Sequence, residues 1–219
     1  MTYIAIYILG AYLTGAIPFG LLIPKLYGTA DIRKIGSGNV GATNVYRACG
    51  ASGALIVTLL DIAKGAIPVL LAGLLYKESL PVALEYLRLT VGFAAILGHI
   101  FSPYLKFKGG KGVNTALGVF LMLIPIPTMI ALLSFIIVVS VTRYVSLGSI
   151  IAAGVLFAVV AIMYYGDLGT MHQVYVPTGL AIFLLIVLTH HANLRRLLSG
   201  EENRFSFKRS GEKELSGNG

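Results

Sequence analysis

Charged residues are scarce in this chain. Asp, Glu, Lys and Arg make up 12% of its 219 residues, whereas hydrophobic residues make up 57%. A soluble domain carries about 25% charged residues, so this composition excludes a soluble globular protein. Long apolar runs recur from one end of the chain to the other, which is typical of a polytopic α-helical membrane protein. The short alternating segments of a transmembrane β-barrel do not occur.

Cysteine and carboxylates are also few. Cys49 is the single cysteine, which excludes an intrachain disulfide, and we expect it to be a small buried residue. Nine Asp and Glu stand against 17 Lys and Arg, and in a membrane protein the resulting net charge of +8 is first a topology signal, not a sign of nucleic-acid binding. No group of His, Asp, Glu or Cys has the spacing of metal ligands, so we expect no bound metal. We also expect no cofactor and no nucleic-acid partner.

Seven apolar segments are long enough or nearly long enough to cross a bilayer. They cover residues 3–24, 51–76, 86–105, 112–124, 126–142, 145–165 and 174–191. The fourth is short, since a crossing takes about 20 residues. Pro125 and Pro127 favour a break between the fourth and fifth segments over one long helix.

The basic residues predict the orientation of these segments. They cluster after the first segment (Lys25, Arg33, Lys34, Arg47), after the third (Lys106, Lys108, Lys111) and after the last (Arg195, Arg196, Arg204, Lys208, Arg209, Lys213). With seven crossings all three clusters face the cytoplasm, as basic loops usually do. We therefore predict an all-α polytopic membrane protein with seven transmembrane helices, N-terminus outside and C-terminus cytoplasmic. Residues 1–205 are predicted to form one transmembrane domain, followed by a polar, disordered tail over 206–219.

Three polar stretches share the predicted cytoplasmic face. They are GSGNVGATNVYR (36–47), GHIFSPYLKFKGGKG (98–112) and HHANLRR (190–196). Glycine lets the backbone N–H groups approach an anion, and helix N-termini add partial positive charge. Lysine and arginine supply full charges, arginine with a bidentate fork. This combination, almost free of carboxylates, predicts a phosphate-binding site.

These stretches also match other patterns. Gly36, Gly38 and Gly41 match the spacing of the dinucleotide fingerprint, but no βαβ unit surrounds them. FKGGKGVNT fails the P-loop pattern because Lys111 is followed by glycine. The glycines alone would fit helix packing, and KFKGGKG alone would fit an ordinary basic loop. Asp61 and Lys64 lie one helical turn apart within an apolar segment, and we expect a structural ion pair there.

The three stretches together resemble one enzyme family. SGNVGATNVYR and GHIFSPYLKFKGGKGVNTALG resemble the first two signatures of PlsY, the acyl-phosphate:glycerol-3-phosphate acyltransferases of bacterial membranes. HHANLRRLLSGEENRF resembles the third signature, which usually reads His-Arg-x-Asn. His190 and Asn193 match it, whereas His191 replaces the arginine, so no role is carried over to His191. The resemblance extends from Tyr12 to about Phe205.

The resemblance implies a reaction and a location. An acyl group would move from an acyl-phosphate to the 1-hydroxyl of sn-glycerol 3-phosphate, giving lysophosphatidic acid and phosphate. The active site would face the cytoplasm from the bacterial inner membrane, among membrane lipids, and a monomer is the working expectation. The resemblance implies Ser37, Lys111 and His190 as catalytic residues. It implies substrate-binding roles for Asn39, Thr43, Asn44, Arg47, Lys108, Gly109, Gly110, Gly112, Ser149 and Asn193.

The sequence offers few candidates for a general base. No histidine has an aspartate four or five positions downstream, so the histidine–aspartate dyad of many glycerolipid acyltransferases is missing. We therefore expect catalysis chiefly by positioning and electrostatics. The proton of the attacking hydroxyl would pass to a substrate phosphate or to His190, and a covalent role for Ser37 is the alternative mechanism.

Two rival functions remain open on sequence alone. A transporter of a phosphorylated metabolite also needs glycine-broken helices and cations, but transporters tend to show paired halves, and no second half mirrors this one. A structural subunit that binds anionic lipid through KFKGGKG leaves the amide-rich first stretch unexplained.

Overall fold

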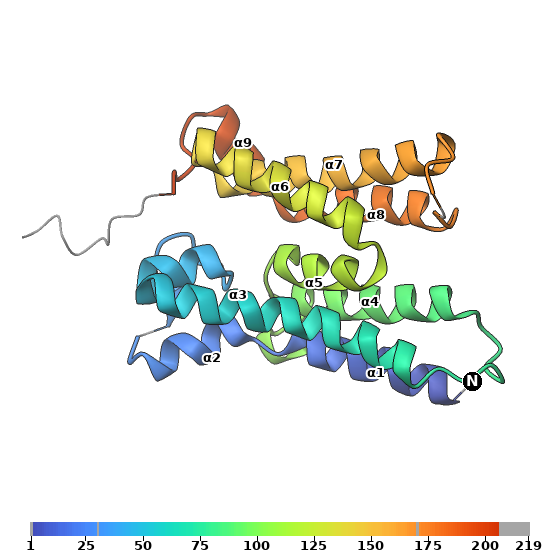
Figure 1. Ribbon diagram of the computed structural model, residues 1–219. Helices are drawn as coiled ribbons and strands as arrows, with labels where there is room; N and C mark the ends of the chain where they lie inside the picture. The colour runs from blue at the N-terminus through green and yellow to red at the C-terminus, as the bar shows by residue number, and fades with distance from the viewer. Residues whose placement is uncertain (1, 30, 170, 206–219) are drawn as a thin grey trace, which may run out of the picture. The chain divides into compact units, whose positions relative to one another are not determined.

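The computed structural model of the chain describes residues 2–29, 31–169 and 171–205 (Figure 1). Every regular element within these ranges is a helix, which confirms the all-α prediction. The chain divides into two compact units, the first running to Leu123 and the second beginning at Ile124. A single domain over 1–205 stays a prediction. The predicted tail, 206–219, lies outside the described residues.

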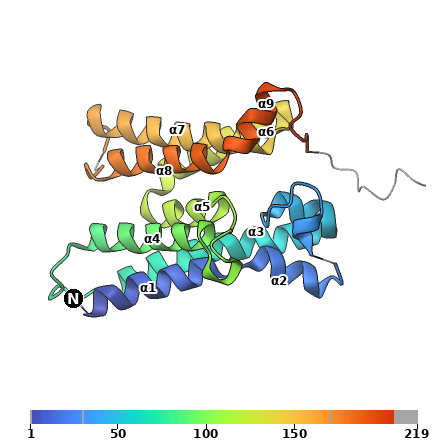
Figure 2. The ribbon, with the colours of Figure 1, turned by 180° about the vertical axis from the view of Figure 1, so that it is seen from behind.

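The first unit is built from five α-helices and two short 3₁₀ turns. They are α1 (Thr2–Ala16), α2 (Phe19–Leu26), η1 (Ile32–Lys34), α3 (Ala42–Leu74), α4 (Leu84–Ile100), η2 (Pro103–Leu105) and α5 (Val113–Leu123). α1 packs along α4, and α5 packs along α3, as Figures 1 and 2 both show. The small core between α1, α3 and α4 is apolar and includes Ala11, Ala72, Leu87, Val91 and Ala95. The loops that follow α2 and α4 lie away from the end at which residues 75–83 join α3 to α4 (Figures 1 and 2).

Glycine allows the close helix contacts within this unit. A Cβ on Gly15 would overlap the backbone of Ala95, and a Cβ on Gly118 would overlap the Ile62 carbonyl. Such small residues are common where membrane helices approach closely. Any larger residue at Gly15 would push α1 away from α4.

Two expected helix boundaries are wrong. The segment expected over 3–24 is broken at Ile17 and Pro18, with a bend of 40° between α1 and α2. Pro18 lacks an N–H group and disfavours helical backbone in the residue before it, which accounts for the break. The helix expected from 51 instead begins at Ala42, and Gly50 (φ 76°) kinks it. A separate helical leg over 42–49 therefore carries the end of the first polar stretch.

The second unit contains α6 (Pro125–Thr142), α7 (Val145–Tyr165), α8 (Tyr175–Thr189) and α9 (His191–Leu198). α7 packs against both α6 and α8. The break predicted at Pro125 is confirmed, since α5 ends at Leu123 and α6 begins at Pro125. α6 ends where Arg143 adopts a left-handed conformation (φ 62°).

The helices confirm a multi-pass membrane protein. Four of those described are long and apolar enough to span a bilayer, and six spans result if α1 with α2 and α8 with α9 each count as one. α5 has 11 residues and is apolar but short, as expected for the fourth segment. Seven crossings and the orientation of the termini stay predictions.

Candidate active site

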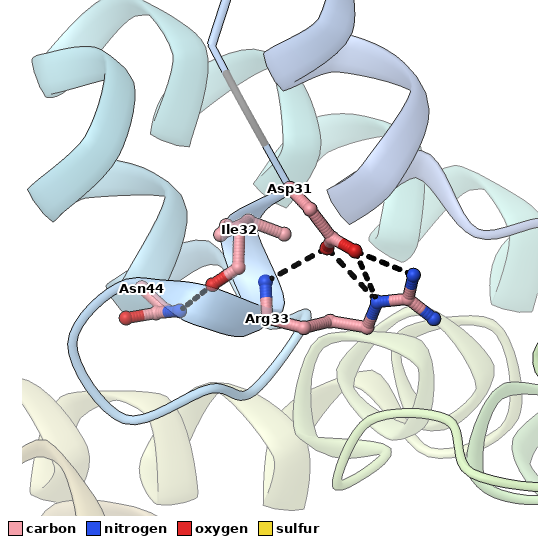
Figure 3. Close-up of polar contacts among 4 residues, drawn as sticks. All are labelled: Asp31, Ile32, Arg33 and Asn44. Carbon is pink, nitrogen blue, oxygen red and sulfur yellow. Dashed lines mark hydrogen bonds and ion pairs between the residues drawn. The ribbon is translucent and has the colours of Figure 1, made fainter.

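Asn44 organises the first polar loop from inside the protein. Its side chain is 1% exposed. Its Nδ2 donates to the carbonyls of Ile32 (3.1 Å) and Ile35 (2.9 Å), and the contact with Ile32 is drawn in Figure 3. Its Oδ1 accepts from the backbone N–H of Ser37 (3.1 Å). These three hydrogen bonds satisfy the buried amide. They also hold the loop in place. Direct contact of Asn44 with substrate stays a prediction.

The loop that Asn44 holds presents Ser37 and Arg47 at one place. Gly36 (φ 54°) and Gly38 (φ 71°) adopt left-handed conformations on either side of Ser37, which only glycine adopts without strain. Ser37 itself is exposed. A Cβ added to Gly36 would come within 3.1 Å of the Arg47 Cδ, so the arginine stem lies directly beside the loop. The turn therefore brings a hydroxyl and a guanidinium together.

Asn39 and Thr43 shape the entry into α3. Asn39 Oδ1 accepts from the N–H of Gly41 (2.8 Å), an Asx turn that directs the chain into the helix. Thr43 lies in the first turn of the 42–49 leg and is half-buried. The N–H groups of a first helical turn have no partners within the helix, and they favour an anion.

Two arginines near this loop differ in their surroundings. Arg33 pairs with Asp31 through its Nε (2.9 and 3.0 Å), as drawn in Figure 3. The hydrogen bonds from the Arg33 side chain and backbone lower the pKa of Asp31 to about 2. Arg47 takes part in none of the ion pairs among the described residues. Arg47, and not Arg33, is thus the guanidinium available to an anionic ligand.

The second polar stretch forms a tight loop between α4 and α5. The N–H groups of Lys108, Gly109 and Gly110 donate to the carbonyls of Leu105, Ile100 and His99 at 2.9–3.1 Å. The predicted substrate-binding residues of this loop would hold a phosphate through their backbone N–H groups over 108–112. The first three N–H groups are already engaged, so only the end of this range, next to the start of α5, keeps that possibility.

Gly112 and Lys111 lie at that end of the loop. Gly112 is buried and left-handed (φ 83°), and α5 begins at the next residue, Val113. Lys111 is half-buried, whereas Lys106 and Lys108 are exposed. An ammonium group beside a helix N-terminus provides the positive charge and N–H groups that bind phosphate.

A buried polar cluster lies beneath these loops. Lys64 Nζ lies 2.7 Å from Asp61 Oδ1, which confirms the expected ion pair. His99 Nδ1 lies 3.8 Å from the same oxygen. The three side chains line a small cavity together with Val40 from the first stretch and Gly110 from the second. The sequence test for a histidine–aspartate dyad missed His99 and Asp61, because two different helices contribute them.

In the second unit, Glu202 collects the polar groups of the third stretch. Its carboxylate accepts from Asn193 Nδ2 (2.6 Å), Ser146 Oγ (2.7 Å) and Arg196 Nε (2.7 Å). Burial by itself would raise the pKa of Glu202, but the hydrogen bonds from Asn193, Ser146 and Arg196 outweigh it and lower the pKa. Glu202 and Ser146 were not among the predicted site residues. The one signal for Glu202 is a pair of carboxylates, Glu201 and Glu202, in a motif otherwise rich in basic residues.

The remaining predicted residues of this unit are buried beside helix carbonyls. His190 is 3% exposed, with its Nδ1 2.8 Å from the Ile186 carbonyl. A carbonyl only accepts, so this contact requires a proton on Nδ1. His191 makes a similar contact with the Leu188 carbonyl (3.0 Å). Ser149 Oγ donates to the Val145 carbonyl (2.9 Å) within α7, so its place at a phosphate site stays a prediction.

Comparison with known proteins places this arrangement in a family. Residues 5–200 match the sequence model described as glycerol-3-phosphate acyltransferase. The chain belongs to the glycerol-3-phosphate acyltransferase family. A glycerol-3-phosphate acyltransferase of Trichlorobacter lovleyi is 46% identical over 199 residues, which are 91% of this chain and 96% of that protein. One from Syntrophotalea carbinolica is 44% identical over 214 residues, 94% of this chain and 99% of the other.

Solved structures of this family agree in fold. The crystal structure of PlsY, an integral membrane glycerol 3-phosphate acyltransferase, in its glycerol 3-phosphate form has 36% identity and a TM-score of 0.81, and the alignment covers 98% of this chain and 99% of that one. The form described as that of lysophosphatidic acid gives a TM-score of 0.79, with coverage of 94% and 96%. The resemblance drawn from the three motifs is confirmed. Acylation of glycerol 3-phosphate is the activity of this family.

Proposed function

We propose that this protein transfers a fatty acyl group from an acyl-phosphate to the 1-hydroxyl of sn-glycerol 3-phosphate. The hydroxyl oxygen attacks the acyl carbonyl carbon, the bond from that carbon to the phosphate oxygen breaks, and lysophosphatidic acid and inorganic phosphate are the products. Both substrates are phosphorylated, so the site needs two groups of cations and N–H donors. An acyl-phosphate is already activated, and bound cations stabilise its leaving group.

The observation that carries this proposal is that Ser37, on the turn, and Arg47, on the helical leg over 42–49, lie beside one another. Asn44 fixes the backbone N–H of Ser37, and the Arg47 stem lies beside Gly36. Arg47 makes no ion pair with the described carboxylates, so its fork is available to the phosphate of glycerol 3-phosphate. Ser37 would contact the reacting centre, and Asn39 and Thr43 would hold the shape of the turn.

The second loop would supply the other cationic groups. We assign Lys111 to glycerol 3-phosphate and Lys108, with the backbone at Gly112, to the acyl-phosphate. Gly109 and Gly110 would act by letting the loop fold closely over α4, because their N–H groups already donate to Ile100 and His99.

His190 and Asn193 of the third stretch would hold glycerol 3-phosphate, and Ser149 of α7 would face a phosphate. The attacking hydroxyl must lose a proton, and we assign it to a substrate phosphate, which titrates near neutrality. His190 is the second candidate base, since histidine is the side chain that most often acts as a general base, and the Ile186 carbonyl orients its ring. Asn193, oriented by Glu202, would donate to the bound substrate.

The donor is tested directly with the purified protein in detergent or lipid cubic phase and no added metal. Glycerol 3-phosphate is supplied with either palmitoyl-phosphate or palmitoyl-CoA. We expect phosphate release and lysophosphatidic acid from palmitoyl-phosphate alone. Turnover with palmitoyl-CoA only would overturn the donor assignment. No turnover with either donor, from folded monodisperse protein, would overturn the proposed function.

The alternative covalent mechanism is tested in the same preparation. Palmitoyl-phosphate without acceptor is added, and the protein is examined by intact mass spectrometry. We expect no acyl adduct, and we expect Ser37→Ala to reduce kcat without abolishing it. An added palmitoyl group that disappears in Ser37→Ala would instead assign Ser37 as the nucleophile.

For topology we propose seven crossings in the bacterial inner membrane, with α5 as a short crossing, the N-terminus outside and the active site facing the cytoplasm. The support is the distribution of basic residues. Cys49 is the single cysteine, so Cys49→Ala provides a background for labelling. In intact cells, an impermeant maleimide should label Tyr3→Cys but neither Lys106→Cys nor Asn203→Cys. Labelling of both Tyr3→Cys and Asn203→Cys would show an even number of crossings.

A further inference from the structure

The ion pair of Asp61 and Lys64 is buried within the first unit. Besides pairing within α3, it contacts the junction of α1 and α2. The side chains of Asp61 and Lys64 are each 3% exposed. Lys64 Nζ also donates to the Ile17 carbonyl (2.8 Å), at the break between α1 and α2, and lies over the Phe19 ring (5.6 Å to its centroid). Isolated buried charges are costly, so the pair is expected to have a task that an apolar pair would not perform.

His99 connects this pair to the second polar loop. Its Nδ1 lies 3.8 Å from Asp61 Oδ1 and has no hydrogen-bond partner among the described residues. The other side of the ring lies against Gly110, where an added Cβ would overlap Nε2 and come within 3.0 Å of Cε1. The backbone carbonyl of His99 accepts from the N–H of Gly110 (3.1 Å). His99 therefore contacts Gly110 through both its ring and its backbone.

The contact with His99 accounts for two glycines of the loop. Neither Gly109 nor Gly110 has a positive φ, so their backbone conformations are open to other residues. What excludes a side chain is space: at Gly110 the His99 ring, and at Gly109 the backbone carbonyls of His99 and Ile100. The loop thus lies directly on the end of α4, and the position of the His99 ring determines where Gly110 and the following Lys111 can be.

We propose that His99, which is buried beside the Asp61–Lys64 pair, is a positioning residue for acyl transfer. Its ring sets the height of Gly110 above α4 and thereby the place of Lys111 and Gly112 at the phosphate site. It touches neither substrate. This inference rests on the proposed function of the loop, although it does not depend on which acyl donor the enzyme uses.

The first test separates positioning from stability. His99→Ala should lower kcat/KM for glycerol 3-phosphate by about 100-fold, the order expected for a misplacement of about 1 Å. His99→Gln, whose amide reaches the position of Nε2, should recover at least tenfold of this loss. Leu87→Ala is the matched control, because Leu87 is a buried α4 residue (1% exposed) in the core between α1, α3 and α4. It should lower the Tm at least as much as His99→Ala and leave KM unchanged.

The second test uses the two glycines. Gly110→Ala should lower kcat/KM by about 100-fold in the wild type but by less than about fivefold in the His99→Ala background, because the ring that it clashes with is gone. Gly109→Ala should cost the same factor in both backgrounds, because the carbonyls that it meets remain. Binding of glycerol 3-phosphate is measured by calorimetry on the same variants, and its Kd should follow the same pattern.

The outcomes distinguish this inference from the proposed function. Equal costs of Gly110→Ala in both backgrounds, or an unchanged KM and kcat in folded His99→Ala, would overturn the positioning role. If the wild type uses a donor other than acyl-phosphate, the same variants are compared with that donor. In that case the donor assignment is wrong, but the positioning role of His99 can still be tested. If the wild type neither turns over nor binds glycerol 3-phosphate, the proposed function fails first, and the inference fails with it.

Discussion

Asn44 and Ser37 are joined by a hydrogen bond of 3.1 Å, from the backbone N–H of the serine to the side-chain oxygen of the asparagine. The same amide donates to the carbonyls of Ile32 and Ile35. One buried side chain thus closes the segment over 32–44 and fixes the backbone of a candidate catalytic residue, Ser37. The structure shows the Asn44 side chain bonded to Ile32, Ile35 and Ser37, and its contact with substrate stays a prediction.

We predict that Asn44→Ala loses both activity and stability. Three hydrogen bonds disappear, and the carbonyls of Ile32 and Ile35 lose a donor, so the free energy of unfolding should fall by about 1–3 kcal/mol. Displacement of Ser37 should lower kcat/KM by about 100-fold. Thermal unfolding and steady-state kinetics check both. Asn203→Ala, the loss of an exposed amide, is the control. An active Asn44→Ala enzyme would show that the loop does not need this bond.

Lys111 and Lys106 should differ although both belong to the same loop. Lys111→Ala should reduce kcat/KM by about 100- to 1,000-fold, as for the loss of a group that stabilises charge in the transition state, while the protein remains folded. Lys106 is exposed and left-handed (φ 53°), so Lys106→Asn, which suits that conformation, should leave the kinetics unchanged. Equal losses in the two variants would indicate that only the total charge of the loop matters.

Arg47 and Arg33 form a second matched pair. Arg47→Lys keeps the charge but loses the bidentate fork, and we expect a rise of about tenfold or more in KM for glycerol 3-phosphate. Arg33→Lys changes a solvent-exposed pair with Asp31, which contributes little, so its kinetics should match the wild type. A normal KM in Arg47→Lys would place the phosphate elsewhere.

Glu202 predicts a pH dependence of stability. Its pKa is lowered from the ordinary value of 4.5, because the hydrogen bonds from Asn193, Ser146 and Arg196 outweigh the effect of burial. The native state therefore holds the carboxylate ionised more readily than the unfolded chain does. The resulting stability is present above about pH 4.5 and is lost as the pH falls through the lowered native pKa.

The measurement is thermal unfolding of wild type and Glu202→Gln between pH 3 and 7. At pH 7 the variant should be less stable by about 1–3 kcal/mol, and the difference should narrow below about pH 4.5. Glu201→Gln, one residue away and exposed, should follow the wild type at every pH. A gap that stays constant down to pH 3 would contradict the role given to the Glu202 charge.

The sequence alone determined the class of this protein and the residues of its motifs. Apolar runs of membrane length can hide their backbone polar groups only as helices, and Pro125 could be predicted to end a helix because it lacks a backbone N–H group. The pair of Asp61 and Lys64 could be predicted because residues three apart share one face of a helix. The family could be recognised because the motifs are contiguous in the chain.

Only the tertiary structure determines which polar groups of the three motifs are bonded within the protein. That Asn44 and the N–H groups of Gly109 and Gly110 are engaged within the protein follows from contacts across a loop or between a loop and a helix end. His99 lies near Asp61, which is 38 positions away in the chain. Glu202 accepts from Ser146, which is 56 positions away. Local periodicity carries no information about such distances. Packing sets them, because burial leaves each polar group only the partners that surrounding helices bring to it.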